Sequence, residues 1–428
     1  MLRRTYFHPM KESTGLIAEL TWRGLLYQST SDLPGFLDEG PTKAYCGFDP
    51  TAQSLHVGNL VPVMGLVHLQ RAGHTPIALV GGGTGLIGDP SGKTTERPLA
   101  GPEVVAENSQ RVRAQLERFL DFTGKSAALM RDNAEWLRPL GAIELLRDVG
   151  KHFTINVMLA KESVQSRIEG GISFTEFSYM LLQAYDYLEL YRREGARLQI
   201  GGSDQWGNIT AGIDLIRKVE RVQAHALTLP LVTNTSGTKF GKTEAGSVWL
   251  DPEMTSPYKF YQFWINVDDR DAARYLRYFT LLPRKEIEAL DRAIETSPEK
   301  REAQQALADD VTSRVHGADA ARIAAEVSRV LFGKADPESL STEVLAALSK
   351  EVETIEMTSA PSVVDGLVSL KLAASKGAAR RLLEQGGVYV NGKRVGADAT
   401  LESIAPLAGS CYLIRKGAKD YAMLRIRR

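Results

Sequence analysis

The 428-residue chain is 43% hydrophobic and 24% charged, with a formal net charge of zero, as expected of a soluble globular protein with two or three domains. Only two cysteines occur, Cys46 and Cys411, which excludes a disulfide framework and a cysteine-ligated zinc site and fits a reducing cytoplasm. No apolar run is long enough to cross a bilayer, and Glu19 and Arg23 interrupt the first apolar stretch, so we expect neither a membrane span nor a secretion signal.

Strand and helix patterns alternate in the first part of the chain. Residues 45–48 predict a short buried strand, and apolar residues with helical spacing predict a helix from about residue 56 to Gly73. Residues 76–80 and 198–200 predict two further buried strands, each followed at once by glycines. This order is typical of a parallel α/β sheet, in which ligands bind at the carboxyl ends of the strands.

Two glycine-rich motifs after the strand at 76–80 fit known nucleotide loops poorly. Residues 83–88 match G-x-G-x-x-G, but Asp89-Pro90 follows, so no helix can start there as a dinucleotide site requires. Residues 92–94 (GKT) resemble the end of a P-loop, but Ile87 occupies the position of its first glycine. A mobile turn is one interpretation. We favour a loop whose backbone approaches a ligand, with Asp89 directed at an ammonium group.

Two short motifs, about 180 residues apart, resemble halves of one phosphate site. Residues 56–59 (HVGN) precede the first predicted helix, where unpaired N–H groups favour an anion. Residues 239–243 (KFGKT) lie in a polar loop that could fold two lysines over a triphosphate. Residues 230–232 predict a strand leading to this flexible tip, as a mobile lid requires. An incidental histidine and a solvated basic turn are the alternatives.

Three polar residues, Tyr179, Gln183 and Asp186, have the i, i+4, i+7 spacing of one helix stripe. A core helix would carry apolar side chains there, so these polar groups must pair with protein or with a ligand. A surface stripe and an internal polar network are the alternatives to a ligand pocket.

The C-terminal part of the chain is basic. Residues 361–428 contain 12 Lys or Arg and 5 Asp or Glu, so a net charge of +7 there is balanced by −7 in the rest of the chain. Residues 283–333 predict a helical domain, and 358–362 predict a linker. Beyond the linker, 375–383 predict a basic helix and 386–393 a tight β-turn unit, which suggests a polyanionic partner. A solvated charged surface is the alternative.

Together these motifs resemble the bacterial tyrosyl-tRNA synthetases, a family of class I aminoacyl-tRNA synthetases. Residues 45–52 (YCGFDPTA) and 56–59 are similar to the family's first signature, and 239–243 are similar to its second. Residues 171–179 (GISFTEFSY) and 199–208 (QIGGSDQWGN) match the family almost letter for letter. Asn59 replaces a second histidine common in the family, but its amide can still donate a hydrogen bond, so we expect function to be kept.

The resemblance implies a role for each site residue. Asp186 and Tyr45 would hold the phenolic hydroxyl of tyrosine, and Tyr179, Gln183 and Asp89 its α-ammonium group. The full tyrosine-binding set would be Tyr45, Asp89, Asn133, Tyr179, Gln183, Asp186 and Gln205. ATP would contact Cys46, Gly47, Asp49, His56, Gly58, Asn59, Gly202, Asp204 and Lys242. Charge on the leaving pyrophosphate would be stabilised by Thr51, His56, Asn59, Lys93, Arg97, Lys239, Lys242 and Thr243. RNA would be bound by Lys376, Arg380, Arg381, Lys393 and Arg394 of an S4-like tail.

The implied fold is α/β, with a Rossmann-like parallel-sheet catalytic domain followed by a helical domain and a small α+β S4-like RNA-binding domain. We place the boundaries at 1–230 for the catalytic domain, 231–357 for the signature lid loop and helical tRNA-contacting domain, and 358–428 for the linker and tail. The implied enzyme is a cytoplasmic, homodimeric tyrosine–tRNA ligase. It would use L-tyrosine, ATP with Mg²⁺ and tRNA(Tyr), with no protein-bound metal cluster and no membrane partner.

Two rival functions follow from the same residues. A tryptophanyl-tRNA synthetase would share the fold, but Asp186 and Tyr45 favour a substrate with a hydroxyl group, and the S4-like tail agrees. An RNA-binding protein with a retired active site is the second rival. The intact Asp186 and Gln205, and both lysines of the second signature, argue against it.

Overall fold

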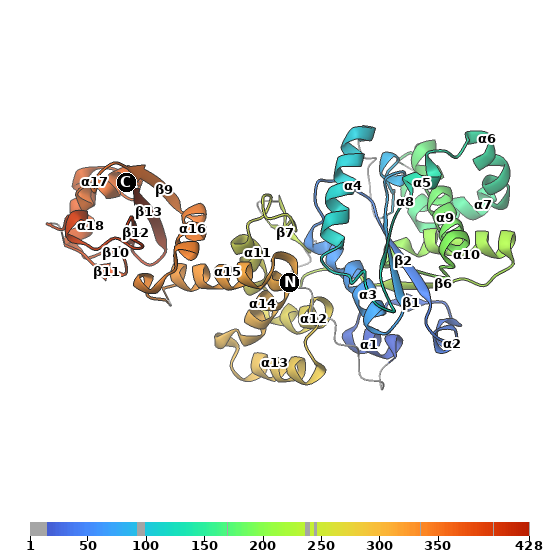
Figure 1. Ribbon diagram of the computed structural model, residues 1–428, viewed down its shortest axis with the longest axis horizontal. Coiled ribbons are helices and arrows are strands. Elements are labelled where there is room, and N and C mark those ends of the chain that lie inside the picture. The colour runs from blue at the N-terminus through green and yellow to red at the C-terminus, as the bar shows by residue number, and fades with distance from the viewer. Residues whose placement is uncertain are drawn as a thin grey trace. The chain divides into compact units, whose positions relative to one another are not determined.

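The computed structural model describes residues 15–91, 99–168, 170–235, 240–243, 246–333, 335–396 and 398–427. The chain forms two compact units (Figure 1). The first unit contains the residues up to 255 together with 267–307, and the second contains 256–266 and the residues from 308 onward. None of the described helices is long and apolar enough to cross a membrane.

A six-stranded sheet forms the centre of the first unit (Figure 1). Its strands are β1 (Gln28–Ser29), β2 (Lys43–Phe48), β3 (Thr75–Val80), β4 (Leu129–Asp132), β5 (Leu198–Gly202) and β6 (His225–Leu229). Their order is β1-β6-β5-β2-β3-β4, and every neighbouring pair is parallel except β1 with β6. Strand β2 lies between β3 and β5, so the strand order reverses on either side of it. Ligands of such sheets bind at this switch point.

Helices cover this sheet and continue beyond it. They are α1 (Leu16–Arg23), α2 (Leu33–Asp38), α3 (Leu60–Arg71), α4 (Pro102–Leu116), α5 (Ala134–Leu137), α6 (Ala142–Glu144), α7 (Ile155–Leu159), α8 (Glu162–Ile168), α9 (Phe174–Glu194), α10 (Trp206–Glu220), α12 (Asp269–Phe279) and α13 (Arg284–Thr296). The longest, α9, begins where the Ser173 side chain accepts a hydrogen bond from the Glu176 N–H, and it ends at Gly195 in a left-handed conformation. One face of α9 packs into the core through Ala184, Tyr187 and Leu188.

A second, five-stranded sheet belongs to the second unit. Its strands are β9 (Glu353–Met357), β10 (Val388–Val390), β11 (Lys393–Arg394), β12 (Cys411–Lys416) and β13 (Asp420–Ile426), in the order β11-β10-β12-β13-β9. The helices are α11 (Pro257–Ile265), α14 (Glu302–His316, which begins in the first unit), α15 (Ala318–Leu331), α16 (Thr342–Glu351), α17 (Val363–Ser369) and α18 (Lys376–Glu384). Asn391 and Gly392 both have positive φ, which gives the tight turn between β10 and β11.

Most predicted elements are confirmed, and one is wrong. The predicted strands at 45–48, 76–80 and 198–200 lie within β2, β3 and β5. The strand predicted at 230–232 does not exist, because β6 ends at Leu229. Pro230 follows directly, and a proline has no N–H with which to continue a strand ladder.

The domain boundaries at 231 and 358 stay predictions. Strand β9 lies before residue 358 in the sequence, yet it pairs in parallel with β13, from Glu353 opposite Ala422 to Met357 opposite Ile426. Val344 and Leu348 of α16 pack in one cluster with residues of β12 and β13. The C-terminal sheet therefore includes a strand that the composition of the proposed linker gave no reason to expect.

Candidate active site

The loops that follow β2, β3 and β5 begin at the same edge of the sheet, because β2 is parallel to both β3 and β5. Phe48 lies opposite Val80 in this register. Asp49 follows β2 and residues 81–83, all glycine, follow β3. A Cβ atom on Gly81 would lie 2.0 Å from Oδ1 of Asp49, so only glycine lets this backbone approach the carboxylate. Within the motif at 83–88, a Cβ on Gly83 would lie 2.9 Å from Cδ1 of Leu137, and the chain forms a short 3-10 turn at Thr84–Leu86 in place of a longer helix.

A buried carboxylate lies beneath this loop. Asp186 of α9 is 2% exposed. Its Oδ1 accepts a hydrogen bond from Nε1 of Trp136 at 2.7 Å, and its Oδ2 accepts one from Nδ2 of Asn133 at 2.9 Å. Burial raises the pKa of Asp186 to about 8, although the hydrogen bonds from Asn133 and Trp136 act in the opposite direction. The carboxylate is therefore held in one orientation by two neutral donors.

Next to it lies a phenol with no partner. Tyr45 is 1% exposed, and its hydroxyl has no hydrogen bond to any residue that the structure describes. Burial, and then the charge of Asp186, raise the pKa of Tyr45 well above its ordinary value. The ring of Tyr45 meets that of Tyr187 edge to face, with centroids 5.1 Å apart, which fixes its position. A buried hydroxyl without a partner is costly, so it indicates a place for a polar ligand group.

Asp49 links the pocket to the glycine loop. Its Oδ2 accepts a hydrogen bond from the hydroxyl of Tyr179 at 2.7 Å, and its Oδ1 accepts one from Oγ1 of Thr84 at 2.6 Å. Burial, followed by the charges of Asp49 and Asp89, raises the pKa of Tyr179, so the phenol stays protonated and donates. Thr84 also accepts a hydrogen bond from Nδ2 of Asn133 at 2.9 Å. One network thus joins β2, the loop after β3, the turn after β4, and α9.

A second polar cluster gathers around Asp89. Nε2 of Gln205 donates to Oδ2 of Asp89 at 2.7 Å, and the Ser91 N–H donates to Oδ1 at 2.9 Å. The buried Asn208 places its Nδ2 3.1 Å from Oε1 of Gln183 and 3.2 Å from Oε1 of Gln205. These acceptor oxygens on Asp89, Gln183 and Gln205 gather at the start of α10, which suits an ammonium group.

The two signature motifs lie side by side in the first unit. The Val57 N–H donates to the carbonyl of Val248 at 3.0 Å, and the Leu250 N–H donates to the carbonyl of Leu55 at 2.8 Å. Gly241 has a φ of 77°, and a Cβ there would lie 2.5 Å from Cγ2 of Val57. Main-chain hydrogen bonds therefore join the first signature to the segment just after the second, and Gly241 of the second signature lies against Val57. That the two motifs form one phosphate site stays a prediction.

His56 and Asn59 form a capping box at the start of the helix. Oδ1 of Asn59 accepts from the His56 N–H at 3.0 Å, and Nδ1 of His56 accepts from the Gly58 N–H at 3.0 Å. Because Nδ1 is an acceptor, the proton of the neutral imidazole is on Nε2. The His56 ring also meets that of Trp249 edge to face, with centroids 6.0 Å apart.

The remaining predicted site residues differ in their surroundings. Thr51 and Gly47 are exposed, whereas Cys46 is buried and burial raises the pKa of its thiol to about 12, which keeps it protonated. Gly202 ends β5, and a Cβ on it would lie 2.5 Å from Oδ1 of Asp204. The predictions for Lys93, Arg97 and Lys239 lie outside the described residues. For Lys242 and Thr243 the backbone is described, as strand β7 (Lys242–Thr243), but the side chains are not.

Basic side chains of the tail lie at its surface. Lys376, Arg380 and Arg381 are exposed on α18, and Lys393 and Arg394 are exposed on β11. Nζ of Lys376 lies 2.6 Å from Oδ1 of Asp365, and Nζ of Lys393 lies 2.5 Å from Oε1 of Glu338. These two lysines are therefore partly neutralised by the protein itself.

Sequence reasoning missed four residues of the polar networks: Thr84, Ser91, Trp136 and Asn208. Asn133 and Trp136 are three residues apart directly after β4, which places both indole and amide near α9. That i, i+3 spacing was the available signal. Nothing in the sequence alone pairs Asn208 with Gln183, because they lie on different helices, α10 and α9.

Comparisons with known proteins show which family the chain belongs to. The family model described as tRNA synthetases class I (W and Y) matches residues 37–333, and the model described as Tyrosine--tRNA ligase SYY-like C-terminal domain matches residues 343–424. A tyrosine–tRNA ligase of Bacillus caldotenax is 54% identical over 96% of this chain and 99% of its own length. One from Anaeromyxobacter dehalogenans is 52% identical with the same coverage.

Solved structures give the same result. A C-terminally truncated mitochondrial tyrosyl-tRNA synthetase of Aspergillus nidulans matches with a TM-score of 0.69 and 30% identity over 75% of this chain and 95% of that one. The sheet, the switch-point site and these similarities define a class I aminoacyl-tRNA synthetase fold. The chain belongs to the tyrosine–tRNA ligase family.

Proposed function

We propose that this chain activates L-tyrosine with ATP and transfers the tyrosyl group to the 3′ end of tRNA(Tyr). In the first step a carboxylate oxygen of tyrosine attacks the α-phosphorus of ATP, and the bond to pyrophosphate breaks. In the second step a hydroxyl of the terminal tRNA ribose attacks the tyrosyl carbonyl, and AMP leaves. The membership of the chain in the tyrosine–tRNA ligase family supports both steps.

One observation carries the choice of tyrosine. The buried carboxylate of Asp186, held by Asn133 and Trp136, lies beside the buried Tyr45 hydroxyl that has no partner among the described residues. A phenolic hydroxyl placed between them donates to Asp186 and accepts from Tyr45, which satisfies both groups. A substrate with an indole ring has no acceptor to offer Tyr45, so this end of the pocket favours tyrosine over tryptophan.

The other end of the pocket suits the amino-acid backbone. We assign the α-ammonium group to the acceptor oxygens of Asp89, Gln183 and Tyr179. Gln205, bonded to Asp89, then lies where it can orient the carboxylate for attack. Catalysis needs only positioning and charge stabilisation, because phosphoryl-type transfers of this kind require no covalent bond to the protein.

ATP belongs over the two signatures. We propose that the His56 Nε2–H and the Asn59 amide donate to it, while Gly47, Gly58, Gly202 and Asp204 contact the nucleotide. Lys93, Arg97, Lys239, Lys242, Thr243 and Thr51 are proposed to stabilise the leaving pyrophosphate. We propose that Mg²⁺ enters with the phosphates of ATP.

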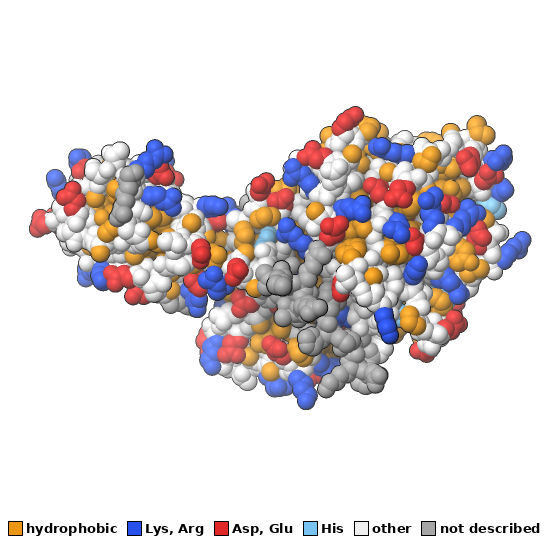
Figure 2. Space-filling view, in the orientation of Figure 1, with side chains coloured by type: hydrophobic (Ala, Val, Ile, Leu, Met, Phe, Trp, Pro, Cys, Tyr) orange, Lys and Arg blue, Asp and Glu red, His pale blue; other side chains and the backbone are white. Residues whose placement is uncertain are grey.

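A homodimer in the cytoplasm is part of the proposal. Large apolar side chains of α6 and α7 reach solvent: Ile143 is 76% exposed, Ile155 59% and Val157 54%. Figure 2 shows apolar side chains at the surface over this end of the first unit. Such clustering favours a protein interface. Ile155→Asp should shift the chain towards monomers in sedimentation velocity, and an unchanged sedimentation coefficient would contradict this assignment.

The decisive experiment is ATP–pyrophosphate exchange with each of the twenty amino acids. We expect exchange with tyrosine and weak exchange with phenylalanine. Phenylalanine leaves the Tyr45 hydroxyl without a partner and offers Asp186 no hydrogen bond, which costs roughly 3 kcal/mol, or about 100-fold, at the least. Asp186→Ala should abolish this discrimination along with most activity, whereas Asp214→Ala, an exposed carboxylate on α10, should not. Preferred exchange with tryptophan, or with no amino acid, would refute the proposed function.

A further inference from the structure

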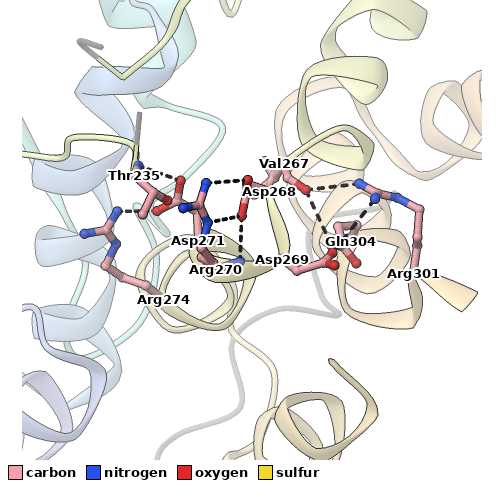
Figure 3. A network of polar contacts seen from close by, with 9 residues as sticks. All are labelled: Thr235, Val267, Asp268, Asp269, Arg270, Asp271, Arg274, Arg301 and Gln304. Atoms are coloured by element: carbon pink, nitrogen blue, oxygen red, sulfur yellow. Dashed lines mark hydrogen bonds and ion pairs between the residues drawn. The ribbon is translucent and has the colours of Figure 1, made fainter. Parts of the chain in front are cut away.

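The chain segment that enters the second signature is held by side chains of α12 (Figure 3). Oδ2 of Asp271 accepts a hydrogen bond from the Thr235 N–H at 2.9 Å. Nη2 of Arg274 donates to the carbonyl of Thr233 and to Oδ1 of Asp271, both at 2.6 Å. The hydroxyl of Tyr275 lies 3.4 Å from the same Thr233 carbonyl. Residues 233–235 are thus bound by one face of a single helix, although 36 residues separate Thr235 from Asp271.

The same helix also holds the segment where it is next described. Phe240 is buried, and its ring meets Tyr275 edge to face at a centroid distance of 5.0 Å. It also stacks on Phe279, with centroids 5.2 Å apart and ring planes within 10°. One face of α12 therefore contacts the chain on both sides of residues 236–239.

The helix is itself fixed at its start. Asp268 caps it, accepting from the Arg270 N–H at 2.9 Å. Arg301 donates to the carbonyl of Val267 at 3.0 Å, and Gln304 donates to Oδ1 of Asp269 at 2.5 Å. All of these residues lie in the first unit, and Figure 3 shows them as one continuous network. A helix tied down in this way can set the position of the backbone that it binds.

Burial makes the Asp271 contact costly to lose. The Asp271 side chain is 5% exposed, and its two oxygens are divided between a side-chain cation and a backbone N–H of a different segment. Removing one partner of a buried ion pair leaves an uncompensated charge and is strongly destabilising. Here one oxygen binds the approach to a catalytic motif.

We propose that Asp271 and Arg274 are positioning residues for the second signature. With Tyr275 and Phe279 they form what we call the α12 anchor. By fixing residues 233–235 and Phe240, the α12 anchor sets where the signature backbone stands relative to Val57 and Gly58 of the first signature. The anchor therefore acts on adenylate formation and not on tyrosine binding. This inference rests on the proposed function for the reaction that the anchor serves.

The test compares Asp271→Asn with the matched control Asp291→Asn. Asp291 lies on α13 and forms an ion pair with Arg277 of α12, but among the described residues it has no hydrogen bond or ion pair with residues 233–235 or with Phe240. Single-turnover kinetics would give the tyrosine Kd and the rate of adenylate formation separately. We expect Asp271→Asn to lower that rate by about 10- to 100-fold with the tyrosine Kd changed less than about 2-fold, because small misplacements of catalytic groups cost rates of this order. The control should change neither.

A second readout measures the anchor without any activity. Amide hydrogen exchange in the peptide that contains residues 231–235 should accelerate in Asp271→Asn and stay unchanged in Asp291→Asn. If Asp271→Asn proves unstable, Arg274→Gln at a half-exposed position removes the Thr233 contact and should show the same kinetic pattern. Equal behaviour of Asp271→Asn and its control in both readouts, or parallel losses of tyrosine binding and rate, would overturn the proposal. If the wild-type protein were inactive but the amide hydrogen exchange of the variants followed the predicted pattern, the proposed function would be refuted. The binding of residues 233–235 by the α12 anchor would still be supported.

Discussion

Asp186 carries a desolvation penalty and is also the residue proposed to select a substrate with a hydroxyl group. A carboxylate that is 2% exposed carries a large desolvation penalty, and the protein offsets it with two neutral donors instead of a counter-ion. An arginine partner would have stabilised the charge but would also have occupied the position proposed for the substrate hydroxyl. The choice of Asn133 and Trp136 leaves the charge only partly compensated, which raises the pKa of Asp186 to about 8.

This pKa predicts how stability depends on pH. In the unfolded chain an aspartate titrates near 3.8, whereas the folded value is about 8, so folding favours the protonated form. The contribution of Asp186 is fully present below the unfolded value and is lost as pH rises through the folded one. Asn cannot titrate, so wild-type protein should lose stability relative to Asp186→Asn between about pH 5 and about pH 8.5, as measured by urea unfolding.

A control separates this effect from general acid sensitivity. Asp148 is an exposed carboxylate whose pKa is lowered by the hydrogen bond from Arg147, so it is already ionised across this range. Asp148→Asn should leave the pH dependence between these values as in the wild type. A difference between wild type and Asp186→Asn that does not vary with pH would show that Asp186 is ionised throughout.

The grouping of side chains could be predicted where one helix or one motif carries them, whereas their roles stay predictions. The stripe of Tyr179, Gln183 and Asp186 follows from helical spacing alone, and the structure shows that its members enter polar networks within the protein. The partners Trp136 and Thr84 were not predicted, because they come from turns after β4 and β3. Which turns meet depends on the order of the strands, and spacing in the sequence carries no information about that order.

At the scale of elements, the central feature is the contact between two loops. Strands β7 (Lys242–Thr243) and β8 (Gly246–Ser247) form a small hairpin, and the chain leaving it pairs with the first signature through Val248 and Leu250. Gly241 enters this hairpin with positive φ directly against Val57. The geometry of the hairpin therefore controls the distance between the signatures.

Gly241→Ala should disturb that distance. The new Cβ meets Val57, and the left-handed backbone costs an L-residue about 1–2 kcal/mol. We expect adenylate formation to slow by about 10-fold or more with tyrosine affinity unchanged, in single-turnover assays. Gly246→Ala is the matched control, because Gly246 also has positive φ but a Cβ there would meet no described atom within 4 Å. Equal effects of the two substitutions would show that backbone strain, and not the contact with Val57, is responsible.

The prediction of elements succeeded for the buried strands of the first sheet. It failed at residues 230–232 and for β9. The apolar runs in β2, β3 and β5 have no alternative to the core, so local pattern and structure agree. The strand predicted at 230–232 was placed by its apolar letters, although Pro230 prevents pairing there. Strand β9 was not predicted, because its side chains do not alternate clearly between buried and exposed positions. Its partner, β13, also lies about 65 residues further along the chain.

For the whole molecule, the uneven distribution of charge is the property that bears on the proposed binding of tRNA. The +7 of residues 361–428 lies on a folded sheet with exposed Arg380 and Arg381 on α18. On the face shown in Figure 2, acidic and basic side chains of the first unit are interspersed. Stopping the chain after Ser359 would remove the charge, but it would also remove β13 and leave β9 unpaired. Substitutions on α18 test the charge without that complication.

Arg380→Ala with Arg381→Ala should weaken tRNA binding and leave tyrosine-dependent pyrophosphate exchange unchanged. If each arginine neutralises one phosphate, the slope of log K against log salt should become shallower by roughly 1.8. Filter binding over a salt series gives the slope. The matched control, Arg380→Lys with Arg381→Lys, keeps the charge and should keep the slope. An unchanged slope in the alanine variant would place the RNA contacts elsewhere on the chain.

The parallel pairing of β9 with β13 also bears on how the protein is made. A nascent chain emerges from the ribosome with its N-terminus first. All residues of the first unit are therefore available once residue 307 has emerged. The second unit must wait, because β13, which pairs with β9, is synthesised after the other described strands of its sheet. Until then Val344 and Leu348 lack their partners in β12 and β13. Folding of this unit therefore follows the synthesis of β13, and any nascent chain stalled before β13 presents an open apolar surface to chaperones and proteases.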